Sequence, residues 1–423
     1  MAILNWGWTR RDFLGAVGGA LSALASLAPR RLLASAGPRA ATDAGGQASS
    51  GDIYQRLGVR TRINAKGTYT YLTGSLIFPE AVKAMEEAAQ HYVVLDELQH
   101  AAGARIAQLL GVEAACVSSG AAGAMTIGVA ACVAGSDPDK IKRIPDTTGM
   151  KNEVVIQRAH RYAFDHAIRN VGVKLIEVET EDDLEHSISD KTAMLHFLNE
   201  AQNRGKIGLA KWIEAGKRHG IPTFNDAAAD VPPVSHLSDY NKMGFDLVAF
   251  SGGKGLRGPQ SAGLLLGRKD LIEAALLNNN PNEDTIGRPL KVGKEEIAGM
   301  CAAVEQYLKI DHDAEWKDWE ARLDVIDRAV ASIPTVHTAR FVPEIANHVP
   351  HLSVQWDEKA LGLTMADCLK RLEDGEPSIV CLGGEDSKRG LAMTPFMMRP
   401  GEEAIVARRL AEILSAAAKQ HNG

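Results

Sequence analysis

The feature of this sequence that most limits its fold is a series of short apolar runs, separated by helical segments, over residues 114–266. Runs of this length suit strands that are buried on both faces of a parallel sheet, because the intervening helices cover those faces. The expected strands are Ala114–Val117, Glu153–Gln157, Lys174–Val178, Ala193–Leu198, Pro222–Asn225, Asp246–Phe250 and Ala262–Leu266. The pattern therefore predicts an α/β protein with a doubly wound, mostly parallel sheet.

The chain on either side of these runs indicates how it divides into domains. Helices are expected over 79–92 and 97–110, and a helix of small residues over 120–133. Beyond Gly267 helices dominate over 294–332, followed by a β-rich stretch and a closing helix over 402–419. We expect an N-terminal segment (52–78), a large domain (79–290) and a smaller α+β domain (291–423).

The first 36 residues have the character of an export signal. Thr9-Arg10-Arg11-Asp12-Phe13-Leu14 resembles the twin-arginine signature, a weakly hydrophobic stretch follows, and Ala34-Ser35-Ala36 offers a small-residue cleavage site. An amphipathic leader helix that stays attached is the alternative. The order of these features predicts a twin-arginine signal peptide (1–36), a flexible linker (37–51) and a periplasmic or extracellular protein, with no membrane contact beyond export.

Charge and cysteine content exclude several classes of function. The net charge of −6 would become −9 after cleavage, because four arginines and one aspartate are removed. So acidic a body is poorly suited to binding nucleic acid. The five cysteines include no CxxC pair, which argues against a structural zinc site or a disulfide framework, and we expect no metal.

Three expected strands end in residues that suit one cofactor. The first runs into Ser119-Gly120-Ala121-Ala122 at a helix start, where backbone N–H groups can bind an anion. The strand 222–225 is followed by Asp226, and the strand 246–250 by Ser251-Gly252-Gly253-Lys254. Each feature alone has a structural alternative: a helix cap, a turn-capping carboxylate with Asp230 as competitor, and a surface lysine.

Together, in this order, the three features predict a site for pyridoxal phosphate. The cradle binds the phosphate, Asp226 holds the pyridinium nitrogen, and Lys254 forms a Schiff base with the aldehyde. The strand ends meet at one edge of a parallel sheet, where ligands bind in such folds. The glycines around Lys254 are interpreted as making room for the cofactor and for movement of the amine.

The chain also resembles the selenocysteine synthase-like family of fold type I (aspartate-aminotransferase-like) pyridoxal-phosphate enzymes. The resemblance covers roughly residues 52–418 and lies in "INAKGTYTYLTGS", "ELQHAAGARIAQLLGVEAACVSSGAAGAM", "AKWIEAGKRHGIPTFNDAA", "FSGGKGLRGPQSAGLLLG" and "TPFMMRPGEEAIVARRL". Within the family it is most similar to the subgroup that contains D-glucosaminate-6-phosphate ammonia-lyase. The resemblance implies Lys254 as the Schiff-base lysine, Asp226 as the pyridine partner and Ser119 to Ala122 as part of the phosphate cup, with Ser251 also at the cofactor.

Further candidate residues follow from their places in these motifs. His160 could stack on the ring or assist proton transfer, although a structural histidine is the competing interpretation. Candidates for binding substrate are Asn64, Thr68, Arg158, Arg288 and Arg399, and each arginine could instead be a solvated surface charge.

The resulting hypothesis is a pyridoxal-phosphate-dependent lyase. It would take the α-proton from a small amino acid or amino-sugar acid and eliminate at the β-carbon, releasing ammonia and a 2-keto acid. Transamination, racemisation and selenium transfer to seryl-tRNA remain alternatives, with a non-catalytic binding protein last. The tRNA-binding N-terminal domain of selenocysteine synthase has no counterpart, and the resemblance implies a homodimer or larger homo-oligomer without nucleic acid.

Overall fold

The computed structural model describes residues 52–383 and 389–421. The chain divides into two units, Met1–Arg60 and Thr61–Gly423. The first contains the short helix α2 (Ile53–Arg56), whose first turn is capped by Asp52, with the Gln55 N–H donating to its Oδ1 at 2.9 Å. The predicted signal (1–36) and linker (37–51) lie outside the described residues.

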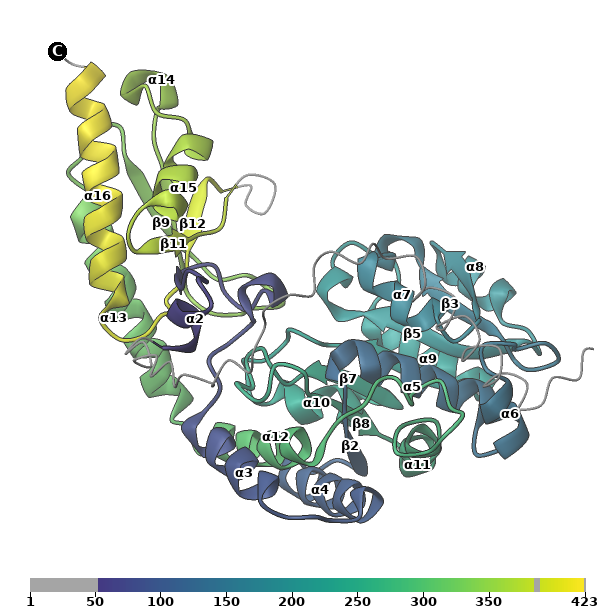
Figure 1. Ribbon diagram of the computed structural model, residues 1–423. Coiled ribbons are helices and arrows are strands. Elements are labelled where there is room, and N and C mark those ends of the chain that lie inside the picture. The colour runs from purple at the N-terminus through teal and green to yellow at the C-terminus, as the bar shows by residue number, and fades with distance from the viewer. Residues whose placement is uncertain (1–51, 384–388, 422–423) are drawn as a thin grey trace, which may run out of the picture. The chain divides into compact units, whose positions relative to one another are not determined.

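The second unit is built on a seven-stranded sheet (Figure 1). The strands, in spatial order, are β2 (Ala114–Ser118), β8 (Gly263–Gly267), β7 (Leu247–Ser251), β6 (Thr223–Asp226), β5 (Thr192–Leu198), β3 (Glu153–Gln157) and β4 (Lys174–Val178). Neighbouring strands are parallel from β7 to β4, whereas β8 runs antiparallel to both β2 and β7. The predicted fold class, a mostly parallel and doubly wound sheet, is confirmed.

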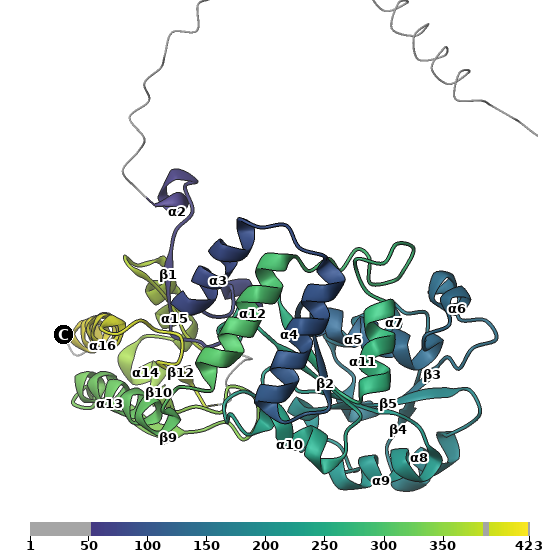
Figure 2. The ribbon, with the colours of Figure 1, turned by 90° about the horizontal axis from the view of Figure 1, so that it is seen from below.

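Helices cover both faces of this sheet, which explains why its strands are apolar throughout. One face packs against α3 (Pro79–Ala89), α4 (Leu95–Leu110), α8 (Glu181–Ser187), α9 (Leu209–His219), α10 (His236–Met243) and α12 (Lys294–Tyr307). The other packs against α5 (Gly120–Ala134), α6 (Pro138–Arg143), α7 (His166–Arg169) and α11 (Lys269–Leu277). Figure 2 shows α3, α4 and α12 lying side by side.

One helix that lies beyond the domain boundary expected from the sequence packs into the core of the large sheet. Val292 and the inward residues of α12, such as Ile297 and Met300, belong to the same core as Trp212 of α9. The core of the large domain therefore extends beyond residue 290 to the end of α12. The sequence does not mark this point, because α12 and the next helix share the same helical periodicity.

The C-terminal region has an α+β core of its own. Its strands β12 (Leu391–Met393), β10 (His351–Gln355) and β9 (His337–Phe341) form an antiparallel sheet in that order. Its helices are α13 (His312–Val330), α14 (Glu358–Leu361), α15 (Met365–Asp374) and α16 (Glu402–His421). The N-terminal strand β1 (Arg62–Asn64) pairs in parallel with β11 (Ser378–Val380), so Ile63 is buried in this C-terminal core.

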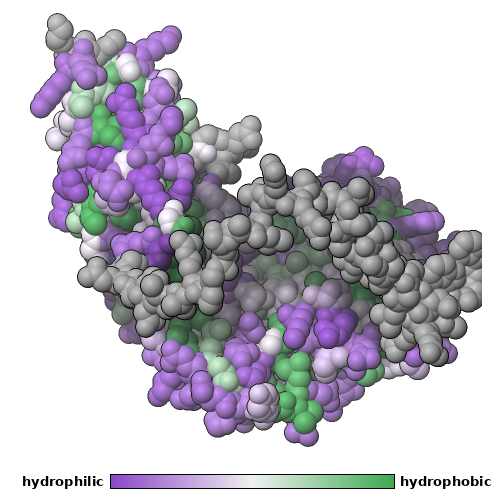
Figure 3. All heavy atoms as spheres, viewed as in Figure 1, coloured by the Kyte–Doolittle hydropathy of each residue, from purple (hydrophilic) through white to green (hydrophobic). Residues whose placement is uncertain are grey.

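On the face of the molecule that Figure 3 shows, the described residues are mostly polar. Figure 3 shows polar side chains over much of the visible face and apolar ones over the α3–α4 region. In the connection between these helices Tyr92 is fully exposed, and Val93 and Val94 are more than half exposed. Within the described ranges no helix combines the length and the apolar character needed to cross a membrane.

Close packing at one glycine generates a test of the sheet. A Cβ atom on Gly263 of β8 would lie 2.4 Å from the carbonyl carbon of Gly120, at the start of α5. We expect Gly263→Ala to lower the free energy of unfolding by roughly 1–3 kcal/mol, because backbone must shift to relieve the overlap. Guanidinium unfolding followed by circular dichroism measures the loss.

The control is Gly208→Ala, where a Cβ atom would meet no atom within 4 Å. Gly208 precedes α9 as its N-cap, so this variant should lose less than about 1 kcal/mol. Equal unfolding midpoints for the two variants would contradict the packing described for Gly263.

Candidate active site

The start of α5 has the form of an anion cradle. Ser119 is the N-cap, Gly120 has a left-handed φ of 64°, and among the described residues no side chain caps the first turn. Ala122 is exposed, and a Cβ atom on Gly120 would meet nothing within 4 Å. The first N–H groups of a 15-residue helix are therefore open to an anionic ligand, and the helix dipole favours one there.

Asp226 is a buried carboxylate at the end of β6. Only 4% of the residue is exposed, and burial raises the pKa of its carboxyl. Three groups oppose this effect: the Tyr162 hydroxyl donates to Oδ2, the Ala228 N–H donates to Oδ1 at 3.1 Å, and the charge of Lys254 lowers the pKa. Asp226 thus lies within the electrostatic reach of the predicted Schiff-base lysine, as a site for a cationic ring requires.

The loop around Lys254 is packed against other backbone segments. A Cβ atom on Gly255 would lie 1.9 Å from the Val231 carbonyl oxygen, and one on Gly253 would lie 2.4 Å from Oε1 of Gln260. Contacts within the protein therefore require these glycines. This is a second reason for them, besides the room for a cofactor that the sequence analysis suggested. Lys254 is half-buried, and Ser251 before it donates its N–H to the Ala228 carbonyl at 3.2 Å. The loops that follow β6 and β7 are therefore joined directly.

His160 and Tyr162 contact opposite faces of β5, although they are only two residues apart. The His160 ring lies edge-on to Phe197, with centroids 4.5 Å apart, whereas the Tyr162 ring stacks on His196. The His196 ring, on which Tyr162 stacks, also contacts the ring of Phe224 in β6. Residues two apart in a strand share a face, so Asp226 lies on the same face as Phe224 and Tyr162. Tyr162, which the sequence analysis did not select, is thus the aromatic residue at the predicted ring-binding carboxylate.

His160 is fully buried and has partners of its own. Its Nδ1 accepts the Leu198 N–H at 3.2 Å, and its Nε2 lies 3.2 Å from the Gln157 amide nitrogen. Burial, together with the nearby charge of Arg204, lowers the pKa of His160 to about 4. These contacts match the structural alternative considered above, and a role in proton transfer stays a prediction.

The three candidate arginines are not brought together. Arg158 is largely exposed and forms ion pairs with Glu177 at 3.2 Å and Glu179 at 2.5 Å. Arg288 is exposed on the loop after α11. Arg399 is also exposed, and its own carbonyl accepts a bond from the buried guanidinium of Arg322 at 2.8 Å. Substrate binding by these arginines stays a prediction, and Arg158 already has two acidic partners.

Asn64 and Thr68 shape a turn that connects three parts of the chain. The Asn64 side chain closes the turn by bonding the backbone of Lys66 and Gly67. The Thr68 hydroxyl donates to Oδ1 of Asn347 at 2.6 Å, and the Asn347 N–H donates to the Ala229 carbonyl at 3.1 Å. Thr68 is thereby linked to the loop that follows Asp226, three residues beyond the carboxylate.

These features fit pyridoxal phosphate in their chemistry. Open N–H groups suit its phosphate, a buried carboxylate suits its protonated ring nitrogen, and a half-buried amine suits its aldehyde. The cradle and the carboxylate share one face of the sheet, because the Tyr162 hydroxyl oxygen, which bonds Asp226, also lies 3.1 Å from the sulfur of Met125 on α5. Sheet and site together define a fold type I pyridoxal-phosphate enzyme.

Comparison with known proteins names the family. The chain belongs to the L-seryl-tRNA selenium transferase (SelA) family, whose model matches residues 63–334. It is 30% identical to the 5'-C-glycyluridine monooxygenase-decarboxylase of a Streptomyces species, over 85% of this chain and 92% of the relative. It is 29% identical to the D-glucosaminate-6-phosphate ammonia lyase of Salmonella typhimurium, over 87% of this chain and 99% of the relative.

Solved structures agree with this assignment. The structure of D-glucosaminate-6-phosphate ammonia-lyase matches with a TM-score of 0.77 and 28% identity, covering 87% of this chain and all of the other. A structure of SPT with PLP, at 14% identity and a TM-score of 0.54, covers 85% of this chain and 89% of the other, and shows the shared fold alone. Family and fold together identify the chain as a pyridoxal-phosphate-dependent enzyme.

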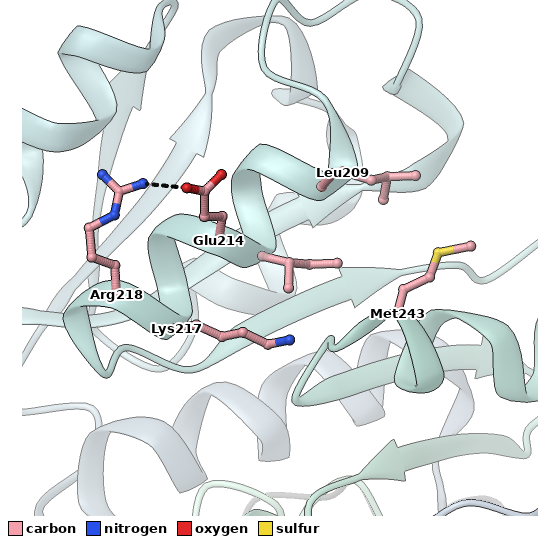
Figure 4. Close-up of a pocket in the computed structure, with 7 residues that line it drawn as sticks. Leu209, Glu214, Lys217, Arg218 and Met243 are labelled. Carbon is pink, nitrogen blue, oxygen red and sulfur yellow. Dashed lines mark hydrogen bonds and ion pairs between the residues drawn. The ribbon is translucent and has the colours of Figure 1, made fainter.

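Other features of the surface lie apart from this site. Figure 4 shows a groove of about 810 Å³ on α9 and α10, where Glu214 accepts a bond from Arg218 at 3.3 Å. None of the residues predicted for the site lines it. Within residues 52–383 and 389–421, no group of three or more histidine, cysteine, aspartate or glutamate side chains is arranged to hold a metal ion.

The buried carboxyl of Asp230 gives the site region a testable dependence on pH. Burial raises its pKa from 3.8 to about 7, and the Asn199 amide donates to its Oδ2 at 2.6 Å. The folded state thus holds this proton more tightly than the unfolded chain does. Its stabilising contribution is complete below about pH 4 and is lost as the pH rises through 7.

We therefore expect Asp230→Asn to remove part of the fall in unfolding free energy between pH 4 and pH 8, by an amount of the order of a few kcal/mol. Denaturant unfolding across this range measures it. Asp182→Asn, at an exposed position on α8, is the control and should leave the profile unchanged. Parallel profiles for Asp230→Asn and the unsubstituted protein would contradict the raised pKa.

Proposed function

We propose that this protein is an ammonia-lyase that acts on a small amino acid or amino-sugar acid carrying a leaving group at the β-carbon. The overall reaction converts a β-hydroxy amino acid into ammonia and a 2-keto acid. The observation that carries the proposal is the common placement of an open helix start, a buried carboxylate and a lysine, in a chain that spans 99% of an ammonia-lyase relative.

Each of these residues has a distinct task in that reaction. The first N–H groups of α5 bind the phosphate, and Asp226 holds the ring nitrogen in its protonated form. Bound pyridoxal phosphate supplies an aldehyde that condenses with amines and a cationic ring that accepts an electron pair. The amine of Lys254 takes the proton from the substrate α-carbon. Asn347 and Thr68 hold the loop beyond Asp226 in place.

A substrate panel tests the proposal. The purified protein, supplied with pyridoxal phosphate, is incubated with D-glucosaminate, its 6-phosphate, and D- and L-serine and threonine. We expect ammonia and a 2-keto acid in equal amounts from at least one of them. Lys254→Ala should lower that rate at least about a hundred-fold, because it removes both the covalent anchor and the base. Ammonia and keto acid assays provide the measurement.

Controls separate the proposal from the other reactions of such enzymes. Lys242→Ala, at an exposed lysine of α10, should retain full activity. Transfer of the amino group to an added keto acid, inversion of the substrate, or release of carbon dioxide in place of ammonia would overturn the ammonia-lyase proposal. Conversion of seryl-tRNA would favour selenium transfer, the activity in the name of the family.

We also propose that the chain works as at least a homodimer. Support comes from the apolar side chains at the connection between α3 and α4, where Tyr92, Val93 and Val94 extend into solvent. A cluster of exposed apolar side chains of this kind is typical of a contact between proteins. The substrate itself is a small molecule bearing an amino group, and the acidic net charge of −6 disfavours nucleic acid as a partner.

Export through the twin-arginine pathway is a further part of the proposed function, supported by the sequence of residues 1–36. We expect the Arg10→Lys, Arg11→Lys double variant to remain inside the cell, because the paired arginines are the recognised feature of such signals. Fractionation of a producing bacterium, with activity or antibody detection, measures the distribution. Equal export of the double variant and the unsubstituted protein would contradict this part of the proposal.

A further inference from the structure

The hydroxyl of Tyr162 makes the only side-chain hydrogen bond that Asp226 receives within the described residues. It donates to Oδ2, while the Ala228 N–H donates to Oδ1 at 3.1 Å. An ionised carboxylate offers about four acceptor positions, so two donors leave room for a third. These two contacts fix the plane of the carboxylate and still leave it able to accept a bond from the ring nitrogen of a cofactor.

Tyr162 is itself held in place at several points. Its ring stacks on His196, with an interplanar angle of 10° and centroids 6.2 Å apart. His196 is fully buried, both of its ring nitrogens are without a hydrogen-bond partner among the described residues, and burial lowers its pKa to about 3. An uncharged His196 therefore supports the Tyr162 ring by packing alone.

The backbone next to Tyr162 is anchored by a charged network. The buried carboxylate of Asp165 accepts bonds from Arg161 at 2.6 Å and Arg169 at 2.9 Å. The same carboxylate accepts the Tyr162 N–H at 3.4 Å. Arg161 also pairs with Glu177, on the edge strand β4. The position of the phenol is thus set by ring stacking on one side and by an ion-pair network on the other.

We propose that Tyr162 is a positioning residue for the cofactor, which orients Asp226 and keeps it in the ionised form that binds a protonated ring nitrogen. This inference rests on the proposed function, since it assigns a role toward pyridoxal phosphate. Tyr162 acts through Asp226. Stacking on His196 fixes the Tyr162 ring, and the fixed ring directs the hydroxyl to Oδ2 of Asp226.

The electrostatics of Asp226 explain why such a donor is needed. A carboxylate with 4% exposure loses most of its contact with water, and burial raises its pKa. Glu200 raises this pKa further, and Asp230 lies close enough for the two carboxyls to interact. Lys254 lowers it, but this amine is the one expected to condense with the cofactor. The Tyr162 hydroxyl is then the side-chain group that continues to favour the charged form.

The variant that tests this inference is Tyr162→Phe, which removes the hydroxyl and retains the ring that stacks on His196. We expect about a ten-fold or greater loss of affinity for pyridoxal phosphate, since a hydrogen bond to a charged group is removed. The loss should grow as the pH falls, because the Asp226 carboxyl of the variant takes up a proton at a higher pH. Absorbance titrations with pyridoxal phosphate between pH 6 and pH 9, together with the pH profile of the bound-cofactor spectrum, measure both effects.

Tyr240→Phe is the matched control. The Tyr240 hydroxyl also bonds a buried carboxyl, that of Asp230 at 3.5 Å, and accepts the Asn199 amide at 2.8 Å. The Tyr240→Phe variant should unfold at a lower midpoint, while its affinity for pyridoxal phosphate and the spectrum of the bound cofactor stay unchanged. Asp226→Asn gives the upper limit of the effect, and adding Tyr162→Phe to it should cause little further loss of affinity.

The outcomes distinguish this inference from the proposed function. If the unsubstituted protein binds no pyridoxal phosphate and borohydride leaves no label on the peptide containing Lys254, the proposed function fails. If it binds the cofactor and Tyr162→Phe binds with the same affinity, spectrum and pH profile, the positioning role alone is overturned. A fall in unfolding midpoint with unchanged affinity also overturns it, because the hydroxyl would then serve stability only.

Discussion

The burial of one carboxylate, Asp226, is the constraint on which the site depends. In water a carboxylate is solvated on every side, whereas here it lies at 4% exposure at the end of a parallel strand. An isolated charge in such a place would take up a proton. The fold opposes this with two donors, the Ala228 N–H in the turn after β6 and the Tyr162 hydroxyl in the loop after β3. Both donors, and the charge of Lys254, favour the ionised form of Asp226, whereas burial raises its pKa.

The same carboxylate explains how far the site extends along the chain. Its loop is bonded to the end of β7 through Ser251 and to the C-terminal region through Asn347. Asn347 in turn accepts two bonds from Thr68, one from its N–H at 3.2 Å and one from its hydroxyl at 2.6 Å. Three segments distant in sequence thus meet at the residues that follow Asp226.

Much of this arrangement could be read from the sequence, and the limits have physical reasons. Short apolar strands, the cradle, Asp226 and Lys254 were predicted because each depends on local pattern and on the rule that strand ends meet at one edge. The antiparallel direction of β8 was not predicted, since an apolar run has no direction. The reach of the first core into α12 was missed because α12 and α13 have the same periodicity.

Tyr162 was missed for a related reason. His160 and Tyr162 stand in one irregular stretch after β3, and sequence alone does not show which of them reaches the face of Asp226. The histidine attracted attention because of its chemistry, yet its ring lies against Phe197 on the other face. Alternation along β5 places His196 and Phe197 on opposite faces, but it does not assign either of them a partner in the loop after β3. The candidate arginines were likewise chosen for their chemistry, whereas their positions depend on side-chain contacts such as those of Arg158 with two glutamates.

The pairing of β1 with β11 has a consequence for how the protein is made. Arg62 of β1 lies opposite Ser378 of β11. During synthesis β1 therefore has no strand to pair with until β11, more than 300 residues later, has been made. Until then Ile63 has no core to enter, whereas β6, which ends at Asp226, and β7, which precedes the Lys254 loop, are already complete. The large sheet can therefore assemble during translation, and insertion of the N-terminal strand closes the structure only after synthesis is nearly finished.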